Sequence, residues 1–249
     1  MAWVIDLDGV IWLGSTPIPG SSEAVVRLRA AGEDVLFVTN NSFATVSQQE
    51  AKLASFGIEA AGDVVTSAMV GAELVSPGER VFVLGGAGIV EAVQARGGIV
   101  VDDATADVVL VGLDRHLSYE RLDRAARAIR TGARFVATNT DATYPTAEGL
   151  LPGGGAIVAA VATASGATPV VAGKPHAPAA TFIRHRLGAD GIMVGDRPGT
   201  DGLFARVLGY RFGLVLSGVT TSSDLPVDPS PDVVAPDLTS LVTAVLEGS

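Results

Sequence analysis

Two aspartates, Asp6 and Asp8, lie one residue apart in the otherwise apolar stretch VIDLDGVIW, which spans residues 4–12. Burying an unpaired carboxylate is costly, so this pair requires an explanation. One explanation is purely structural: Asp8 precedes Gly9, and Asp-Gly between alternating apolar runs favours a tight hairpin turn. The other explanation is chemical, and it requires polar partners from elsewhere in the chain.

Four apolar runs, WVID, VLFV, PVVAG and GIMVG, end in polar or ionisable groups. In chain order, the groups at these ends are Asp6, Asp8, Thr39, Asn40, Lys174, Asp196 and Asp201. In open α/β sheets, ligands bind beyond the carboxyl ends of the strands, where the following helices also begin. If the four runs are neighbouring strands, these groups share one crevice.

Carboxylates together with an ammonium, a hydroxyl and an amide are suited to phosphoryl chemistry. Attack on a phosphate monoester needs a nucleophile, a proton donor for the leaving oxygen, and cations that neutralise the phosphoryl oxygens. A carboxylate can attack to form an aspartyl-phosphate, and Mg²⁺ held by oxygen ligands relieves the repulsion between carboxylate and phosphate. One aspartate of the pair at residues 6 and 8 would then attack while the other handles the proton.

The rest of the chain provides the elements that would position these groups. Nine short apolar runs alternate with amphipathic helical patterns, and we expect strands at residues 3–6, 35–39, 81–85, 98–101, 108–112, 134–138, 169–173, 191–195 and 211–216. Apolar strands separated by helices indicate parallel sheets covered on both faces, hence an α/β fold. Nine strands are many for one sheet of this chain length, which suggests two layers of organisation.

The composition of the chain excludes some kinds of site and disfavours some kinds of partner. The 249 residues are 48% hydrophobic and 18% charged, which is typical of a well-packed globular protein. The absence of cysteine excludes disulfides and thiolate metal sites, and the formal charge of −10 disfavours nucleic acid as a partner. No targeting or membrane-spanning segment is apparent, so we expect a cytoplasmic protein with no membrane partner.

The four groups of residues, taken together and in order, resemble the motifs of the haloacid dehalogenase-like phosphatases. The resemblance is to the NagD-like branch, which includes 4-nitrophenylphosphatases and phosphoglycolate phosphatases, and it covers essentially the whole chain. It rests on Asp6-Leu7-Asp8-Gly9, Thr39-Asn40-Asn41, Gly173-Lys174-Pro175, and Gly195-Asp196 with Asp201. It implies a Rossmann-like doubly wound parallel sheet as the core, with an inserted α/β cap domain.

The resemblance also implies a role for each residue. Asp6 would be the nucleophile, and Asp8 the general acid and then the base for the hydrolytic water. Mg²⁺ would be held by the Asp6 carboxylate, the Asp8 backbone carbonyl and Asp196, while Asp201 would orient metal-bound waters or the lysine. Phosphate binding would fall to Thr39, Asn40 and Lys174. The expected substrate is a small phosphorylated metabolite such as glycerol phosphate, phosphoglycolate, a sugar phosphate or 4-nitrophenyl phosphate.

The middle of the chain carries its own set of strands and helices. With hinges near Pro77-Gly78 and Thr168-Pro169, we expect a discontinuous core at residues 1–76 and 169–249, and a cap at residues 77–168. The loop after the strand at 134–138 could contact substrate through Asn139, Asp141 and Tyr144, or could be an ordinary polar loop. Caps of this kind can also form dimer contacts, so a homodimer stays open.

Other interpretations remain at this point. Gly86 and Gly88 follow a strand as in a dinucleotide-binding turn, and Asp102-Asp103 follows the next strand, but Glu91 occupies the position of the third small residue. Thr39 and Asn40 could simply cap a helix. A phosphotransferase, or a sensor that binds a phospho-ligand without turnover, would use the same strand-end groups.

Overall fold

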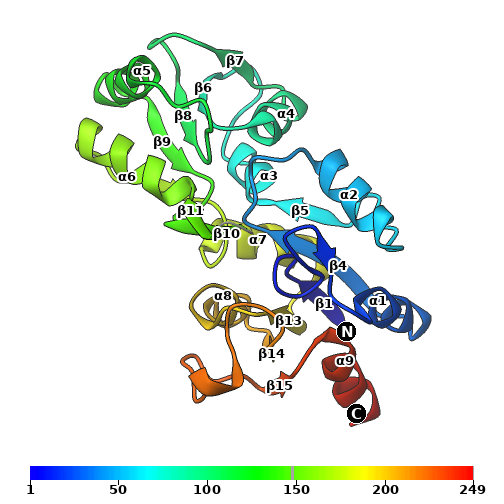
Figure 1. Cartoon of the computed structure of the whole chain (residues 1–249). Coiled ribbons are helices and arrows are strands. Elements are labelled where there is room, and N and C mark those ends of the chain that lie inside the picture. Colours follow the sequence, from blue (N-terminus) through cyan, green and yellow to red (C-terminus); the bar gives the residue numbers. More distant parts are fainter. Residues whose placement is uncertain (147–148, 249) are drawn as a thin grey trace. The chain divides into compact units, whose positions relative to one another are not determined.

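The computed structural model describes residues 1–146 and 149–248 and divides into two compact units. The first unit comprises Met1–Thr39, Gln49–Val65 and Lys174–Ser249, and the second comprises Asn40–Gln48 and Thr66–Gly173. Each unit is built around its own sheet (Figure 1). The expected strands therefore do not form one sheet, as their number had suggested.

The sheet of the first unit has the strand order β15-β14-β13-β1-β4-β5. Its strands are β1 (Ala2–Ile5), β4 (Asp34–Thr39), β5 (Val64–Thr66), β13 (Gly191–Gly195), β14 (Arg211–Val215) and β15 (Val233–Ala235). Every pairing from β15 through β4 is parallel. The chain passes from β1 outward to β4 on one side and returns to β13 on the other. The boundary between β1 and β13 is thus a topological switch point, the position where open α/β sheets bind ligands.

The helices of the first unit pack in pairs beside this sheet. The Arg27 guanidinium of α1 (Ser21–Ala30) donates to Thr243 Oγ1 of α9 (Leu238–Glu247) at 2.7 Å, and the two helices lie side by side in Figure 1. Arg184 of α7 (Ala177–Leu187) donates to the Leu208 carbonyl of α8 (Leu203–Leu208) at 2.8 Å. The shorter elements are β2 (Trp12–Leu13), β3 (Thr16–Pro17), the π-helical turn η1 (Pro198–Gly202) and the 3₁₀ turn η2 (Ser222–Asp224).

The second unit is a parallel sheet between two pairs of helices. Its strand order is β12-β9-β8-β6-β7, with β6 (Arg80–Leu84), β7 (Ile99–Val101), β8 (Val108–Val111), β9 (Arg134–Ala137) and β12 (Val170–Val171). Phe82 and Leu84 pack with α5 (Tyr119–Arg130) and α6 (Gly154–Ser165), whereas Val81 and Val83 pack with α3 (Ser67–Ala72) and α4 (Ala87–Ala95) (Figure 1). Successive side chains of β6 therefore bury against opposite layers, as the period of a strand requires. An antiparallel pair, β10 (Thr143–Thr146) and β11 (Gly149–Pro152), completes the unit, and α2 (Val46–Ser55) has residues in both units.

The expected strands are all present within two residues of their expected bounds, but one of the four with polar ends lies in a different sheet from the other three. Of the four runs with polar ends, β1, β4 and β13 are neighbours in the first unit. The fourth, β12, pairs with β9 in the second unit, so the expectation of four neighbouring strands is wrong for this run. Its following residue, Lys174, nevertheless belongs to the first unit.

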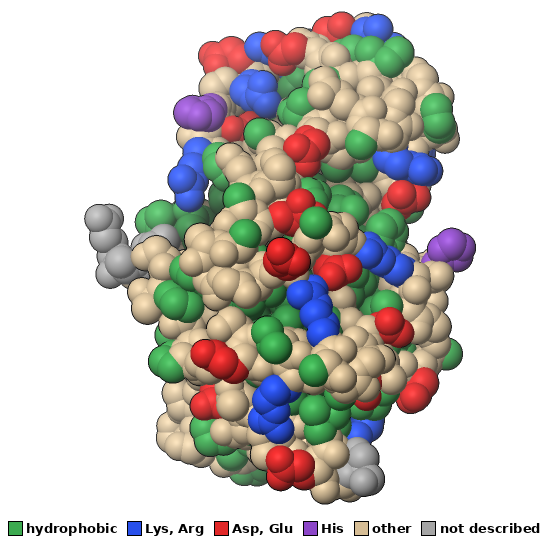
Figure 2. Space-filling view, turned by 90° about the vertical axis from the view of Figure 1, so that its right-hand side faces the viewer, with side chains coloured by type: hydrophobic (Ala, Val, Ile, Leu, Met, Phe, Trp, Pro, Cys, Tyr) green, Lys and Arg blue, Asp and Glu red, His purple; other side chains and the backbone are tan. Residues whose placement is uncertain are grey.

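The surface carries charges of both signs. On the face shown in Figure 2, acidic and basic side chains are interspersed and do not gather by sign. Among the exposed or half-buried ion pairs of the described residues are Arg29 with Asp63 at 2.8 Å and Arg127 with Asp123 at 2.8 Å. Within residues 1–146 and 149–248, no helix combines the length and apolar character needed to cross a bilayer.

Candidate active site

Asp6 lies at the switch point of the first unit. Its strand pairs with β13 through Ile5 and Val194 and with β4 through Ile5 and Phe37, and the Asp6 N–H donates to the Val194 carbonyl at 2.9 Å. These pairings extend the ladder through Asp6 and hold its side chain at the carboxyl end of the sheet. Asp6 is only 8% exposed, so its carboxylate is largely removed from water.

Asp196 lies at the end of the adjacent strand, β13, enclosed by backbone. A Cβ atom at either Gly9 or Gly218 would collide with its Oδ2, so a side chain at either position would displace the carboxyl group; Gly9 also has a φ of 84°. The Val219 N–H donates to Oδ2 at 2.6 Å. The other oxygen, Oδ1, is buried and has no hydrogen-bond partner among the described residues. Such an atom is costly unless a ligand satisfies it.

Lys174 joins two further carboxylates. Its Nζ lies 2.7 Å from Asp6 Oδ1 and 2.7 Å from Asp201 Oδ1, and its side chain is 2% exposed. Asp201 is held within η1, where its Oδ2 accepts the Arg197 N–H at 3.2 Å. Gly195 permits this approach, since a Cβ there would collide with the Asp201 carboxyl group. Side chains from three separate segments of the first unit thus converge.

Burial dominates the electrostatics of this cluster. It raises the pKa of Asp6 well above its ordinary value, against the opposing charge of Lys174. Burial likewise raises the pKa of Asp196 to about 6, and the nearby charge of Asp201 acts in the same direction. Burial lowers the pKa of Lys174, but Asp201 and Asp6 outweigh it, so the net shift is upward and the ammonium stays protonated. One fixed positive charge therefore faces three carboxyl groups.

The carboxyl groups fit a hard divalent cation. Asp6, Asp196 and Asp201 each offer an oxygen, and these oxygens all lie within 4.8 Å of one another. Oxygen ligands of this kind are the ones that Mg²⁺ and Ca²⁺ prefer. A cation at this position would satisfy the unpartnered Oδ1 of Asp196 and offset the excess of negative charge.

Asp8 differs from Asp6 in being exposed. The Leu7 carbonyl accepts the N–H groups of Val10, Ile11 and Trp12, so the backbone turns sharply here. The turn places the Trp12 indole beside Asp8, with Nε1 donating to Asp8 Oδ1 at 2.9 Å, and β2 and β3 form a short antiparallel ribbon immediately afterwards. The turn expected at Asp8-Gly9 is present, but it starts from a parallel strand whose end carries Asp6.

Thr39 ends β4 as a buried residue of the first unit. Asn40, the next residue, belongs to the second unit, where its Nδ2 donates to Asp141 Oδ2 at 3.1 Å and its carbonyl accepts Asn139 Nδ2 at 2.8 Å. The helix-cap interpretation of Thr39 and Asn40 is wrong. Thr45 caps α2 instead: it accepts the Gln48 N–H at 3.2 Å, and the Gln48 side chain accepts the Thr45 N–H at 3.0 Å.

Tyr144 lies in β10 of the second unit. Its hydroxyl accepts a hydrogen bond from the Arg115 guanidinium at 3.2 Å, and Arg115 also lies over the Phe43 ring at 4.9 Å. The structure thus connects Asn139 and Asp141 with Asn40, and Tyr144 with Arg115. Arg115 was not among the expected residues, although it follows the end of β8 in the sequence and could have been found by the strand-end rule.

The dinucleotide interpretation does not agree with the second unit. The turn at Gly86 and Gly88 is covered by a neighbouring segment: the Gly88 N–H donates to the Phe43 carbonyl at 3.0 Å, and a Cβ at Gly86 would lie 2.5 Å from the Phe43 ring. Glu91 accepts the Val46 N–H at 3.0 Å. The helix terminus that would bind a pyrophosphate is therefore occupied by protein.

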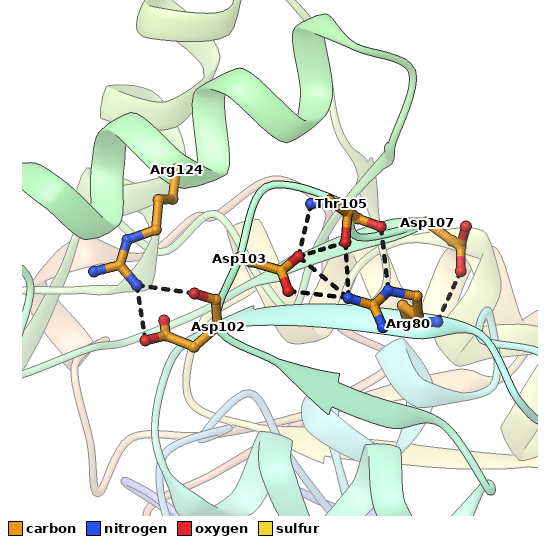
Figure 3. A network of polar contacts seen from close by, with 6 residues as sticks. All are labelled: Arg80, Asp102, Asp103, Thr105, Asp107 and Arg124. Carbon is orange, nitrogen blue, oxygen red and sulfur yellow. Dashed lines mark hydrogen bonds and ion pairs between the residues drawn. The ribbon is translucent and has the colours of Figure 1, made fainter.

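The acidic pair after β7 is also engaged (Figure 3). Asp102 pairs with Arg124 at 2.7 Å, and Asp103 with Arg80 at 3.0 Å. Thr105 donates its hydroxyl to Asp103 at 2.5 Å and its N–H at 2.8 Å, and these two bonds, the hydroxyl one first, lower the pKa of that carboxyl group. These are surface ion pairs, in which water weakens the attraction between the charges, and they fulfil a local structural role.

Two family models match the chain. The model described as haloacid dehalogenase-like hydrolase matches residues 3–98, and the model described as HAD-hydrolase-like matches residues 171–241. The first range contains Asp6 and Asp8, and the second contains Lys174, Asp196 and Asp201.

The chain also has full-length relatives. The acid sugar phosphatase of Staphylococcus saprophyticus is 38% identical over 231 residues, which cover 90% of this chain and 89% of that protein. The p-nitrophenyl phosphatase of Archaeoglobus fulgidus has a TM-score of 0.92 at 33% identity, covering 98% of each chain. The glycerol phosphate phosphatase of Mycobacterium tuberculosis in complex with calcium has a TM-score of 0.89 at 37% identity, covering 96% of this chain and 74% of that one, and it has also been solved with magnesium. The chain therefore belongs to the haloacid dehalogenase-like hydrolase family, in the NagD-like branch.

Proposed function

We propose that this protein is a Mg²⁺-dependent phosphatase that hydrolyses a small phosphorylated metabolite through an aspartyl-phosphate. The observation that carries the proposal is the buried cluster of Asp6, Asp196, Asp201 and Lys174 at the switch point of the first unit. The names of its relatives, an acid sugar phosphatase, a p-nitrophenyl phosphatase and a glycerol phosphate phosphatase, support the same class of substrate.

In the proposed reaction, a carboxylate oxygen of Asp6 attacks phosphorus as the bond to the leaving oxygen breaks. The electron pair of that bond stays with the leaving oxygen, which takes a proton from Asp8 and departs as an alcohol. Water then attacks the phosphorus of the aspartyl-phosphate and gives a proton to Asp8, while the bond from phosphorus to the Asp6 oxygen breaks, its electron pair stays on the regenerated Asp6 carboxylate, and phosphate is released. Lys174 holds the Asp6 carboxylate in place and contributes a positive charge toward the phosphoryl oxygens.

The metal would be held by the Asp6 carboxylate, the Asp8 backbone carbonyl and Asp196. When bound, Mg²⁺ supplies the positive charge that keeps the buried carboxylates ionised and neutralises the phosphoryl oxygens. Asp201 accepts the Lys174 ammonium at 2.7 Å, which supports a role in orienting the lysine.

Phosphate binding would involve Thr39, Asn40 and Lys174, and substrate selection Asn139, Asp141 and Tyr144. In domain terms, residues 1–76 and 169–249 would act as the catalytic core and residues 77–168 as the cap. The compact units differ from this division by placing residues 40–48, 66–76 and 169–173 with the second unit. The inserted sequence is where relatives with a shared core could differ in substrate.

The test is phosphate release from glycerol phosphate, phosphoglycolate, several sugar phosphates and 4-nitrophenyl phosphate, with Mg²⁺ or with EDTA. Metal-dependent release that Asp6→Asn abolishes and Asp103→Asn leaves intact is the expected result. Asp103 is a matched control because it is also a carboxylate paired with one basic side chain, Arg80 (Figure 3), but it is exposed and belongs to the second unit. Equal activity of wild type and Asp6→Asn would contradict the proposal, and transfer to an added alcohol in place of water would indicate a phosphotransferase.

A further inference from the structure

The indole of Trp12 is aimed at the exposed carboxylate of Asp8. Its Nε1 donates to Asp8 Oδ1 at 2.9 Å, although Trp12 itself is only 1% exposed. A buried indole N–H needs an acceptor, and here the acceptor is the side chain to which the proposed reaction assigns the proton. The hydrogen bond therefore does more than satisfy the tryptophan, because it fixes one of the two oxygens of Asp8.

Trp12 is held rigidly enough to impose that orientation. Its ring packs against Phe56, with centroids 5.9 Å apart and an interplanar angle of 57°. On the ring lies the Lys52 ammonium, 3.7 Å from the centroid, which also donates to the Gly14 carbonyl at 2.7 Å. The backbone closes the arrangement, since the Gly9 N–H donates to the Trp12 carbonyl at 2.8 Å. All of these residues belong to the first unit.

We propose that Trp12 is a positioning residue that directs the proton of Asp8 to Oδ2. In a carboxylic acid, the oxygen that accepts an N–H bond is favoured as the carbonyl oxygen, so the acidic hydrogen resides on the other one. Trp12 occupies Oδ1, which leaves Oδ2 to donate to the leaving oxygen and later to receive a proton from water. This inference rests on the proposed phosphatase function.

The effect of losing the Trp12 N–H on the reaction rate depends on the leaving group of the substrate. An alkoxide such as that of glycerol needs the proton from Asp8 as its bond to phosphorus breaks, whereas 4-nitrophenolate is stable enough to leave with its negative charge. Loss of the Trp12 N–H frees the Asp8 side chain to rotate and present either oxygen. Phosphorylation of Asp6 by alkyl phosphates is then slowed, and phosphorylation by 4-nitrophenyl phosphate much less, whereas hydrolysis of the aspartyl-phosphate is the same step for both.

The test compares Trp12→Phe with Trp3→Phe on glycerol phosphate and 4-nitrophenyl phosphate. The phenyl ring keeps an aromatic partner for Phe56 and Lys52 but lacks the N–H. Trp3 is the matched control, since it is fully buried and its Nε1 has no hydrogen-bond partner among the described residues. For Trp12→Phe, we expect kcat/KM, which reports the step in which Asp6 is phosphorylated and the leaving group departs, to fall about 10-fold or more on glycerol phosphate and less than about 3-fold on 4-nitrophenyl phosphate. Trp3→Phe should leave the ratio of the two substrates unchanged.

Other outcomes distinguish a failure of the positioning role from a failure of the proposed phosphatase function. Equal losses of kcat/KM on both substrates, or a kcat/KM ratio equal to that of Trp3→Phe, would overturn the positioning role while leaving the phosphatase function intact. Inactivity of wild type on all substrates would overturn the proposed function, and this inference with it. If Trp12→Phe does not fold, Trp12 can be replaced by benzothienylalanine, which keeps the indole shape and has sulfur in place of the N–H. The replacement is made in the Trp3→Phe background, where Trp12 is the one tryptophan left in the sequence.

Discussion

The ammonium of Lys174 lies 2.7 Å from the carboxylate of Asp6, and both side chains are largely buried. The same ammonium pairs with Asp201 at an equal distance, so one positive charge serves two carboxylates. This sharing makes Lys174 the electrostatic centre of the candidate site. It also makes the site sensitive to any change in the number of charges.

Replacing Lys174 by Met should destabilise the metal-free protein. The substitution leaves the buried carboxylates of Asp6 and Asp201 without their common partner, and loss of one member of a buried pair typically costs about 3–5 kcal/mol. Urea unfolding in EDTA measures the difference. Adding Asp201→Asn to Lys174→Met removes one unpaired charge and should recover part of the lost stability. Simple additivity of the two substitutions would contradict the coupling inferred from the geometry.

Stability of the metal-free protein should fall as pH rises, through Asp196. Its pKa is raised to about 6 in the folded protein from an ordinary value of 3.8, so the folded state binds the proton more tightly than the unfolded state. The contribution of this group to the free energy of unfolding therefore declines between about pH 4 and pH 6 and is constant at higher pH. The total loss is on the order of 3 kcal/mol. Comparison of wild type with Asp196→Asn in EDTA isolates the effect, because the asparagine does not titrate.

The free energy difference between these two proteins should thus shift in favour of Asp196→Asn as pH rises. A difference that stays constant from about pH 4 to pH 7 would show that Asp196 titrates normally. Added Mg²⁺ should stabilise wild type mainly above about pH 6, because ligand carboxyl groups must lose their protons to bind metal. The Asp196→Asn variant should show a much smaller response to the metal.

Gly218→Ala should impair metal binding without a general loss of fold. The added methyl group would collide with Asp196 Oδ2 and displace the carboxyl group that the Val219 N–H holds. We expect Mg²⁺ affinity to fall about 10-fold or more, as is typical when a group that orients a metal ligand is disturbed. Gly199→Ala is the control, since nothing lies within 4 Å of a Cβ at that position and its φ is not positive. Equal metal affinities of the two variants would contradict this account of Asp196.

Asp141→Ala tests how the second unit affects activity. Asp141 holds the Asn40 side chain at 3.1 Å, so if it acts through a phosphate-binding residue, its loss should lower kcat/KM by a similar factor for every substrate. We expect a decrease of about 10-fold, the size of one lost hydrogen bond to a charged group. If Asp141 contacts the variable part of the substrate, the decrease will differ among substrates. Tyr144→Phe provides the comparison, because it removes only the hydroxyl that Arg115 contacts.

Much of the fold follows from local patterns in the sequence. Continuous apolar runs such as those of β8 and β13 predict buried parallel strands, and both are fully buried. The assignment of β12 to a sheet could not be predicted, because both sheets are parallel and apolar and only long-range pairing distinguishes them. The short strands β5 and β15 have three residues each, too few to show a period.

The site was predictable where chemistry concentrates at strand ends. Asp6, Asp196, Asp201 and Lys174 were identified from their residue types and converge in the structure. Val219 was not identified, because it contributes its backbone N–H, a group that nearly every residue type has. The sequence signal for it was Ser217-Gly218, which follows the apolar run at residues 211–216. Trp12 was overlooked because an aromatic residue beside a strand is usually core, and its contact with Asp8 depends on the turn between them.

The central claim is that Asp6 becomes phosphorylated, and the most direct measurement is mass spectrometry of the protein after rapid acid quench during turnover of 4-nitrophenyl phosphate with Mg²⁺. The account predicts a phosphoryl group on Asp6 that is absent in EDTA and in Asp6→Asn. Steady turnover with no phosphorylated enzyme, in wild type and in an Asp8→Asn variant that should hydrolyse the intermediate slowly, would contradict it.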